Sequence, residues 1–330
     1  EVNNIKLFGL GNALVDLEYV VSNKDLQELN IEKGLMTLID EEQNLKLAQN
    51  NLTIHKHAGG GSAANTLFGF SQLGGSGYYS CKVANDSNGD IFINDLNSEG
   101  IDHFYNDSKA GGGTTGTCRV FVTPDGERTM QTFLGITQTY GIEQIDLTKL
   151  QNSEMIYVEG YLVASESAME ACRVAIKNAK SKNVKVALTL SDPSMPTYFK
   201  ENVNELIDFG VDVLFANEEE IKILTGKGSI AAAFDCLKDK VALCVVTKGA
   251  LGAEAHSAQG VESMPGQNAN CIDTLGAGDL FAGAFLYGHL HNKTIAESLK
   301  LGVACSGRLV ELRGPRLSKE EILSITEKLK

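Results

Sequence analysis

The second half of the chain alternates short apolar runs with amphipathic segments, and this alternation constrains the fold more than any other feature. The apolar runs predict buried strands at residues 155–162, 184–190, 213–216 and 242–247. Helices are expected at about residues 167–182, 201–209, 218–224 and 230–239. Strands separated by such helices form a parallel sheet with right-handed crossovers. The sequence therefore predicts an α/β fold of three layers, with helices on both faces of a mainly parallel central sheet.

The first half predicts further strands at residues 5–10 and 77–83, and a small separate sheet. Residues 117–123 and 128–134 are β-rich and flank Pro124-Asp125-Gly126, which is turn chemistry. We expect this hairpin to pair with strands near residues 16–39. The small sheet would then be a lid, formed by about residues 16–39 and 112–136, inserted in a single domain of residues 1–330. Four glycines would form its hinge: Gly111, Gly112, Gly113 and Gly116.

Composition narrows the class of protein. The net charge of −13 disfavours a nucleic-acid binder, since such proteins usually carry a basic face. No apolar run is long enough for a membrane helix, and the N-terminus lacks the pattern of a signal peptide. The seven cysteines are scattered and never in C-x-x-C spacing, which favours reduced thiols. We expect a soluble cytoplasmic protein whose ligand is a small molecule, with no nucleic acid and no membrane as partner.

An anion site is predicted where residues 273–279, Asp-Thr-Leu-Gly-Ala-Gly-Asp, precede an apolar helix. Glycines and small residues there leave backbone N–H groups at the helix N-terminus, a geometry that binds anions without a positive side chain. Asp279 lies in the first helical turn. Taken alone, it could equally be a capping residue that the helix dipole favours.

The same segment resembles the D-T-x-G-A-G-D signature of the ribokinase-like (PfkB) family of carbohydrate and nucleoside kinases. Further segments resemble that family's motifs in the right order over nearly the whole chain. They are Gly-Asn-Ala-Leu-Val-Asp at 11–16, Gly-Gly-Ser-Ala-Ala-Asn-Thr at 60–66, Asn-Glu-Glu-Glu at 217–220, Val-Thr-Lys-Gly-Ala-Leu-Gly at 246–252 and Gly-Pro-Arg at 314–316. The resemblance implies a ribokinase-like fold and ATP-dependent transfer of phosphate to a sugar or nucleoside hydroxymethyl group, leaning to the adenosine-kinase-like branch.

The resemblance also implies roles for the residues at the phosphate. Asp279 would be the base that accepts the proton of the attacking hydroxyl. The backbone N–H groups of Gly276, Ala277, Gly278 and Asp279 would stabilise charge on the transferred phosphoryl group. Arg128, on the lid hairpin, would reach the γ-phosphate when the lid closes, although an ordinary surface arginine on a strand has the same sequence appearance.

On the acceptor side, Asp16 would accept hydrogen bonds from two vicinal hydroxyls, and Asn65 would supply an amide that both donates and accepts. Gly61 would allow the backbone to approach the acceptor closely. The remaining acceptor residues implied by the resemblance are Asn12, Gly60 and Tyr161. The alternatives are a structural turn aspartate at position 16 and an ordinary helix entry at the glycines.

On the nucleotide side, Asn217 and Glu220 would organise Mg²⁺ through its waters, because magnesium keeps much of its hydration. The ATP site would be lined by Thr247, Gly249, Gly252 and Gly314. Asp273 matches a position that binds a monovalent cation, such as K⁺, in some relatives. The alternatives are a surface helix N-terminus for the acidic run and a plain β-turn for the glycine loop.

The acceptor stays open between a nucleoside and a bare sugar of the ribose or fructose type. Adenosine kinases stack the base on a Phe-Phe pair after a strand glycine, whereas here Gly160 is followed by Tyr161 and Leu162. A catalytically silent binding protein on the same fold is the alternative function. An NAD-dependent oxidoreductase is disfavoured, because Gly9-Leu10-Gly11 lacks the third glycine of the dinucleotide fingerprint. The sequence also leaves open a monomer or a lid-mediated homodimer.

Overall fold

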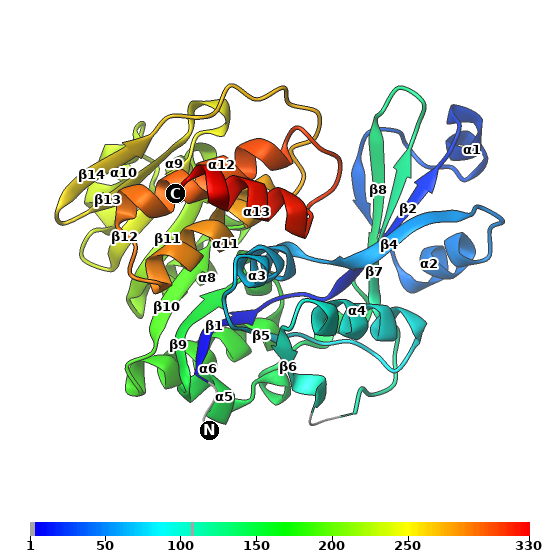
Figure 1. The fold of residues 1–330 in the computed structure, drawn as a ribbon. Coiled ribbons are helices and arrows are strands. Elements are labelled where there is room, and N and C mark those ends of the chain that lie inside the picture. The colour runs from blue at the N-terminus through cyan, green and yellow to red at the C-terminus, as the bar shows by residue number, and fades with distance from the viewer. Residues whose placement is uncertain (1–3, 107–108) are drawn as a thin grey trace.

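The computed structural model describes residues 4–106 and 109–330, and it contains a large sheet flanked by helices with a smaller sheet to one side (Figure 1). In spatial order, the large sheet consists of β14 (Gly260–Met264), β13 (Ala253–Ser257), β12 (Val241–Thr247), β11 (Val211–Asn217), β10 (Lys185–Thr189), β9 (Ser153–Val158), β1 (Ile5–Leu10), β5 (Gly77–Ser80) and β6 (Asp102–His103). Neighbours from β12 to β6 pair in parallel, which confirms the predicted mainly parallel sheet. The antiparallel edge of β13 and β14 was not predicted.

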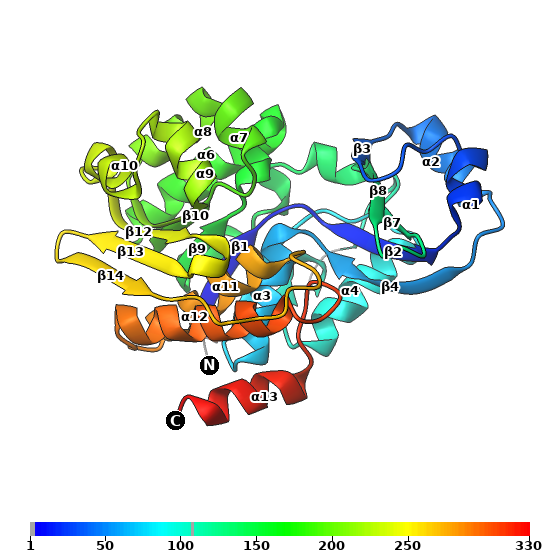
Figure 2. The ribbon, with the colours of Figure 1, turned by 90° about the horizontal axis from the view of Figure 1, so that it is seen from above.

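Helices cover both faces of the large sheet, as Figure 2 shows, so the predicted three layers are confirmed. One face is packed by α5 (Leu147–Gln151), α6 (Glu166–Ser181), α7 (Ser194–Tyr198), α8 (Lys200–Asp208), α9 (Glu218–Thr225) and α10 (Ile230–Leu237). The other is packed by α3 (Ser62–Gln72), α4 (Ser87–Ser98), α11 (Ala277–Leu290) and α12 (Ile295–Leu309), with α13 (Lys319–Lys328) outside α12. Side chains alternate between the layers along each strand: Phe8 packs on the first face and Leu7 on the second.

Most of the described α-helices begin with a side-chain cap, but α3, α7, α8 and α11 do not. Asp40 caps α2 (Glu41–Ala48) together with Gln43 in a capping box. In contrast, α3 begins at Gly61 and α11 at Gly276, each with positive φ and no side-chain hydrogen bond to the first turn. The N–H groups of these two helix ends therefore have no capping oxygen from their N-cap residue.

The small sheet has the spatial order β3 (Met36–Leu38), β8 (Arg128–Phe133), β7 (Gly116–Val122), β2 (Leu14–Val20) and β4 (Ile54–Gly60). The expected strands are present, and β4 is an addition. Its exposed outer half, Ile-His-Lys-His, gives little apolar signal in the sequence. One face packs on α1 (Asn23–Glu28) and α2, where Leu17, Tyr19 and Phe121 form a cluster with Leu26 and Leu47. The other face carries Asp16.

One strand end differs from expectation in a way that affects the site. Strand β9 ends at Val158 rather than at 162, and Gly160–Ala164 form a 3-10 helix, η4, so that Tyr161 is not in the sheet. The other short 3-10 helices are η1 (Phe104–Asn106), η2 (Gly135–Thr139), η3 (Ile142–Gln144) and η5 (Gly249–Leu251). Within residues 4–106 and 109–330, no helix is both long and apolar enough to cross a bilayer.

Candidate active site

Asp279 lies in the first turn of α11 and is held by the neighbouring helix α3. Its Oδ1 accepts a hydrogen bond from the Ser62 hydroxyl at 2.7 Å, and its Oδ2 accepts one from Asn65 Nδ2 at 3.4 Å. The Thr66 hydroxyl donates to the Asp279 carbonyl oxygen at 2.9 Å. The structure therefore brings together two predicted residues, Asp279 and Asn65, from segments far apart in the sequence.

Two further glycines explain how α3 and α11 come this close. A Cβ at Gly283 of α11 would lie 2.3 Å from the Thr66 carbonyl oxygen, and one at Gly69 of α3 would lie 2.5 Å from Leu280 Cδ1. Larger residues would push the helices apart. These glycines thus fix the distance between Asn65 and Asp279, and the motifs of the sequence did not include them.

Asp16 lies on β2 directly against Gly60, one of the glycines predicted on the acceptor side. A Cβ at Gly60 would lie 2.4 Å from Asp16 Oδ2, so that only glycine allows the carboxylate this position. Gly61 has φ of 105° and a Cβ there would lie 2.5 Å from the Asn12 carbonyl oxygen. Asp16, Asn12 and the two glycines are therefore one cluster, as the acceptor interpretation expects.

Sequence reasoning missed Glu159, which is buried beneath this cluster. Its Oε2 accepts the Asn12 N–H at 3.1 Å and its Oε1 accepts the Ala63 N–H at 2.9 Å. The carboxylate thereby connects the Asn12 loop with the first turn of α3. A signal was present: Glu159 directly follows a buried parallel strand, at the sheet edge where α/β proteins place ligands.

Four carboxyl groups of the site have pKa values raised by loss of hydration inside the protein. The pKa is about 6 for Asp279 and about 7 for Asp16, Glu159 and Glu220. For Asp16, desolvation outweighs the opposing effect of the nearby Arg316 and Arg128 guanidinium groups. Carboxyls with such values change protonation state close to neutral pH, as groups that move protons do.

Arg128 connects the small sheet with the loop before α11. Its Nη2 lies 3.5 Å from Glu18 Oε2 and 3.4 Å from Asp273 Oδ2. Asp273 also accepts the N–H groups of Leu275 at 3.0 Å and Gly314 at 3.1 Å. The Asp273 carboxylate is thus surrounded by the Arg128 guanidinium and two N–H donors. These partners suit a counter-ion of Arg128 better than a ligand of a monovalent cation.

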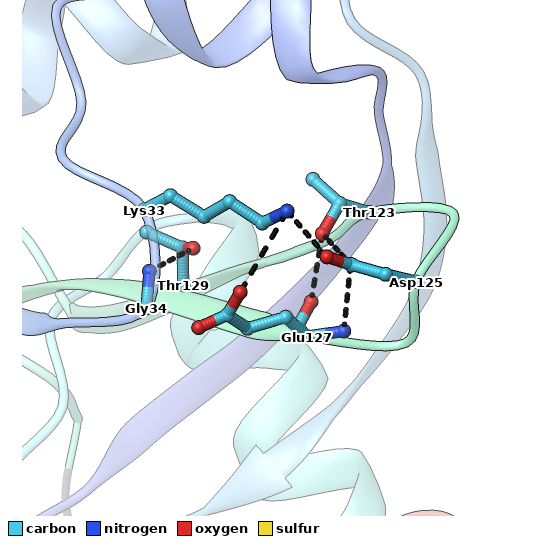
Figure 3. Close-up of polar contacts among 6 residues, drawn as sticks. All are labelled: Lys33, Gly34, Thr123, Asp125, Glu127 and Thr129. Atoms are coloured by element: carbon cyan, nitrogen blue, oxygen red, sulfur yellow. Dashed lines mark hydrogen bonds and ion pairs between the residues drawn. The ribbon is translucent and has the colours of Figure 1, made fainter.

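The turn that precedes Arg128 is held by a polar network, shown in Figure 3. Asp125 accepts hydrogen bonds from the Thr123 hydroxyl at 2.6 Å and from the Glu127 N–H at 3.1 Å. Lys33, which comes from the segment before β3, lies 2.5 Å from Asp125 Oδ2 and 3.6 Å from Glu127 Oε2. The network ties the hairpin to the α1–β3 connection and fixes where β8 begins.

The predicted nucleotide residues lie at the carboxyl ends of β11 and β12. Asn217 pairs with Thr247 across these strands. Asn217 and Glu220 form a capping box, with hydrogen bonds of 2.7 and 2.9 Å between each side chain and the other's N–H. The contacts of this pair are therefore those of a helix N-terminus, the alternative that the sequence left open. Among the described residues no cluster of three or more His, Cys, Asp or Glu is arranged to hold a metal.

Two residues of the glycine loop have backbone roles. Gly249 has φ of 57° with open space at its Cβ position, and Gly252 has φ of 97° with the Met264 carbonyl oxygen 2.0 Å from that position. Gly252 is thus required by the close approach of β14. Gly314 also has positive φ.

Tyr161, predicted on the acceptor side, is about a third exposed. Its hydroxyl donates a hydrogen bond to Asp192 Oδ2 at 3.4 Å.

A family model described as "pfkB family carbohydrate kinase" matches residues 34–322. The chain belongs to the pfkB carbohydrate kinase family. It is accordingly a phosphotransferase with an alcohol group as acceptor. ATP binding is typical of this family, and the central α/β sheet with its small second sheet is the ribokinase-like fold that the motifs implied.

Similar proteins include both nucleoside and sugar kinases. The crystal structure of adenosine kinase from Sinorhizobium meliloti is 31% identical, with a TM-score of 0.86 over 98% of this chain and 99% of that one. A probable sugar kinase from Rhizobium etli is 30% identical, with a TM-score of 0.86 over 99% of each chain. Adenosine kinase 2 of Arabidopsis thaliana is 23% identical over 93% of this chain and 94% of that protein. These pfkB relatives support the adenosine-kinase-like branch.

Proposed function

We propose that this pfkB kinase transfers the γ-phosphate of ATP to the hydroxymethyl group of a nucleoside, with adenosine as the first acceptor to test. The observation that supports the proposal most is the position of Asp279. Its carboxylate lies between the N-terminus of α11 and two side chains of the acceptor-side helix, Ser62 and Asn65. A base placed between an anion-binding helix end and a sugar-binding cluster is what phosphoryl transfer to a hydroxyl requires.

In the proposed reaction, Asp279 in its carboxylate form accepts the proton of the acceptor hydroxymethyl group as the oxygen attacks the γ-phosphorus. The bond from that phosphorus to the β,γ-bridging oxygen breaks, and ADP leaves. Backbone N–H groups of residues 276–279 stabilise the charge on the transferred group. A Cβ at Gly278 would meet no atom within 4 Å, so the backbone there is open to close approach.

Asp16 and Asn65 would hold the acceptor hydroxyls. Asn65 is 8% exposed, and within the described residues its Oδ1 is a buried oxygen without a hydrogen-bond partner. A buried acceptor without a donor is costly, and a substrate hydroxyl would satisfy it. Arg128 would exchange its contact with Asp273 for the phosphate, because its planar fork suits phosphate oxygens.

The residues of the nucleotide side fit a magnesium ion carried by the nucleotide. Magnesium binds through few protein carboxylates and keeps several waters, and Glu220 is a buried carboxyl at the carboxyl end of β11 that could contact it in this way. Glu220 and Asn217 would hold it through water, and the ion would neutralise phosphate charge. Thr247, Gly249, Gly252 and Gly314 would line the ATP site.

A row of side chains across the small sheet favours a nucleoside over a bare sugar. Strand pairing places Leu38, Thr132, Cys118 and Asp16 opposite one another on β3, β8, β7 and β2. Residues paired in this way point to the same face of a sheet. Leu38 is 61% exposed, so an apolar surface continues from the hydroxyl-binding carboxylate. A flat, weakly polar base can cover such a surface, whereas a bare sugar has no group for it.

The proposal is tested by ADP release with adenosine, inosine, guanosine, ribose and fructose. We expect turnover with a nucleoside, and we expect Asp279→Asn to abolish it while ATP binding, measured by calorimetry, survives. Near-wild-type turnover of that variant would exclude Asp279 as the base. Absence of ADP release with every acceptor would favour the catalytically silent binding protein.

A substitution at Leu38 distinguishes a nucleoside acceptor from a bare sugar. We expect Leu38→Ser to raise the KM for adenosine roughly tenfold, since a buried apolar contact is worth about 1.5 kcal/mol. Leu35→Ser, which removes an exposed leucine before β3, is the matched control. If Leu38→Ser leaves the nucleoside KM unchanged, the apolar row does not bind the base.

A further inference from the structure

Arg316 is the last residue of the Gly-Pro-Arg segment, and none of the roles assigned so far uses its side chain. Its guanidinium pairs with both carboxylate oxygens of Asp95 on α4, Nη1 to Oδ1 at 3.1 Å and Nη2 to Oδ2 at 2.6 Å. Nη2 also donates to the Gly59 carbonyl oxygen. The guanidinium lies over the Phe68 ring of α3, 3.4 Å from its centroid. The side chain thus contacts α4, β4 and α3 together.

The contacts of Arg316 hold the end of residues 59–61, which we call the acceptor strip. Asp95 Oδ2 accepts the Gly59 N–H at 2.8 Å, so the Arg316–Asp95 pair engages both polar backbone groups of Gly59. Gly60 follows and forms the wall against the Asp16 carboxylate. Bidentate arginine–carboxylate pairs fix geometry as well as adding energy. A shift of Gly59 would therefore move the surface on which Asp16 rests.

The two residues just before Arg316 contact residues 273–279, which we call the phosphoryl-transfer loop. The Gly314 N–H donates to Asp273 Oδ2 at 3.1 Å. Pro315 packs on Gly276, where a Cβ would lie only 2.7 Å from Pro315 Cβ. Three consecutive residues therefore contact Asp273, the N-cap of α11 and the acceptor strip in turn.

We propose that Arg316 is a positioning residue that couples the acceptor strip, residues 59–61, to the phosphoryl-transfer loop, residues 273–279. A ligand that orders one segment would order the other through the chain from Gly314 to Arg316. The inference rests on the proposed kinase function for what the two segments bind, but the contacts that carry it do not depend on the acceptor. Arg316 touches no reacting atom; it acts on Gly59 directly and on Gly276 through its chain neighbour Pro315.

The alternative is that Arg316 only ties the C-terminal segment to the protein. Arg173 offers a matched control, because it forms a bidentate pair with Glu205 between α6 and α8, at 2.5 and 3.1 Å. A merely structural loss lowers the amount of folded enzyme and leaves KM unchanged, since KM does not depend on enzyme concentration. A positioning loss changes KM and kcat of the folded enzyme.

The test compares Arg316→Gln, Arg316→Lys and Arg173→Gln as full-length proteins. We expect Arg316→Gln to raise the acceptor KM roughly tenfold and to lower kcat. The loss of one hydrogen bond to a charged group changes an equilibrium constant by about this factor. Lysine keeps the charge but lacks the fork, so Arg316→Lys should recover only part of the loss. Arg173→Gln should keep the wild-type KM. An Arg316→Gln enzyme with wild-type KM and kcat overturns the proposal.

A second measurement does not require turnover. Hydrogen exchange should accelerate in Arg316→Gln at both the acceptor strip and the phosphoryl-transfer loop, and at neither in Arg173→Gln. Acceleration at residues 59–61 with wild-type exchange at residues 273–279 overturns the coupling. If the wild-type enzyme releases no ADP with any acceptor, the proposed function fails, and the exchange pattern still decides the role of Arg316.

Discussion

At the residue scale, two glycines of the same turn have opposite surroundings. Gly276 adopts φ of 76° and packs against Pro315, so its glycine is required by the fold. Gly278, two residues on, has no positive φ and no atom near its Cβ position. Its small size is therefore not explained by packing within the protein, which agrees with a ligand approaching the backbone there.

Gly278→Ala separates these two explanations. We expect its melting temperature to stay within about one degree of wild type, because an open position accepts a methyl group, while kcat falls at least about tenfold as the phosphoryl group is displaced. Gly228→Ala is the matched control, because Gly228 also has open space and lies in a turn after α9. Thermal unfolding and ADP release measure the two effects. Full activity of Gly278→Ala would place the phosphoryl group elsewhere.

The raised pKa of Asp279 predicts both the activity and the stability as functions of pH. Because the proposed mechanism requires Asp279 as a carboxylate, the rate should rise with pH through about 6 and level off above it. The folded state favours the protonated carboxyl, so the free energy of unfolding should fall as pH rises from the unfolded pKa of 3.8 through about 6. Asp16, with a pKa of about 7, acts in the same direction.

Asp279→Asn tests the sign of this effect on stability. The variant should melt a few degrees above wild type at pH 8, because asparagine removes a poorly hydrated charge. The difference should shrink toward pH 5, where the aspartic acid is largely protonated. Calorimetry over this pH range measures it, and a variant less stable than wild type at pH 8 would contradict the direction of the pKa shift.

At the scale of elements, the hairpin turn that carries Arg128 depends on Lys33 from a different segment (Figure 3). Lys33→Met should accelerate hydrogen exchange in residues 123–128 about fivefold, since the turn loses the ammonium group that pairs with Asp125 and an exposed ion pair contributes little. The matched control is Lys24→Met, whose i,i+4 pair with Glu28 on α1 is remote from the turn. Equal exchange in both variants would show that Asp125 holds the turn without Lys33.

At the scale of the whole molecule, a chain of net charge −13 must bind a nucleotide that is itself strongly negative. Long-range repulsion slows the encounter, and salt screens it. Raising ionic strength from about 20 to about 200 mM with tetramethylammonium chloride should therefore raise kcat/KM for ATP about twofold to threefold. The proposed acceptor, a nucleoside, is uncharged and serves as the internal control, and its kcat/KM should not change. A decrease for ATP would indicate a locally positive approach to the site.

The sequence alone was sufficient for the layers of the large sheet, because period and length distinguish strands from helices locally. It was also sufficient for the apolar helix that follows the glycines of residues 273–279, because residue type and position there specify the backbone. It did not predict β4, whose outer half is polar, or the antiparallel edge strands. Their pairing depends on neighbours more than on their own residues.

Only the tertiary structure decided which residues meet. Glu159, Gly69 and Gly283 carry no motif that separates them from ordinary residues, yet they set the Asn12 loop and the α3–α11 distance. Arg316 belongs to the Gly-Pro-Arg motif, but only the structure shows that its side chain holds the acceptor strip. The nucleotide-side pair Asn217 and Glu220 shows the converse, a motif whose visible contacts are those of a helix cap. Local sequence determines local conformation, whereas contacts between distant segments follow from how the whole chain packs.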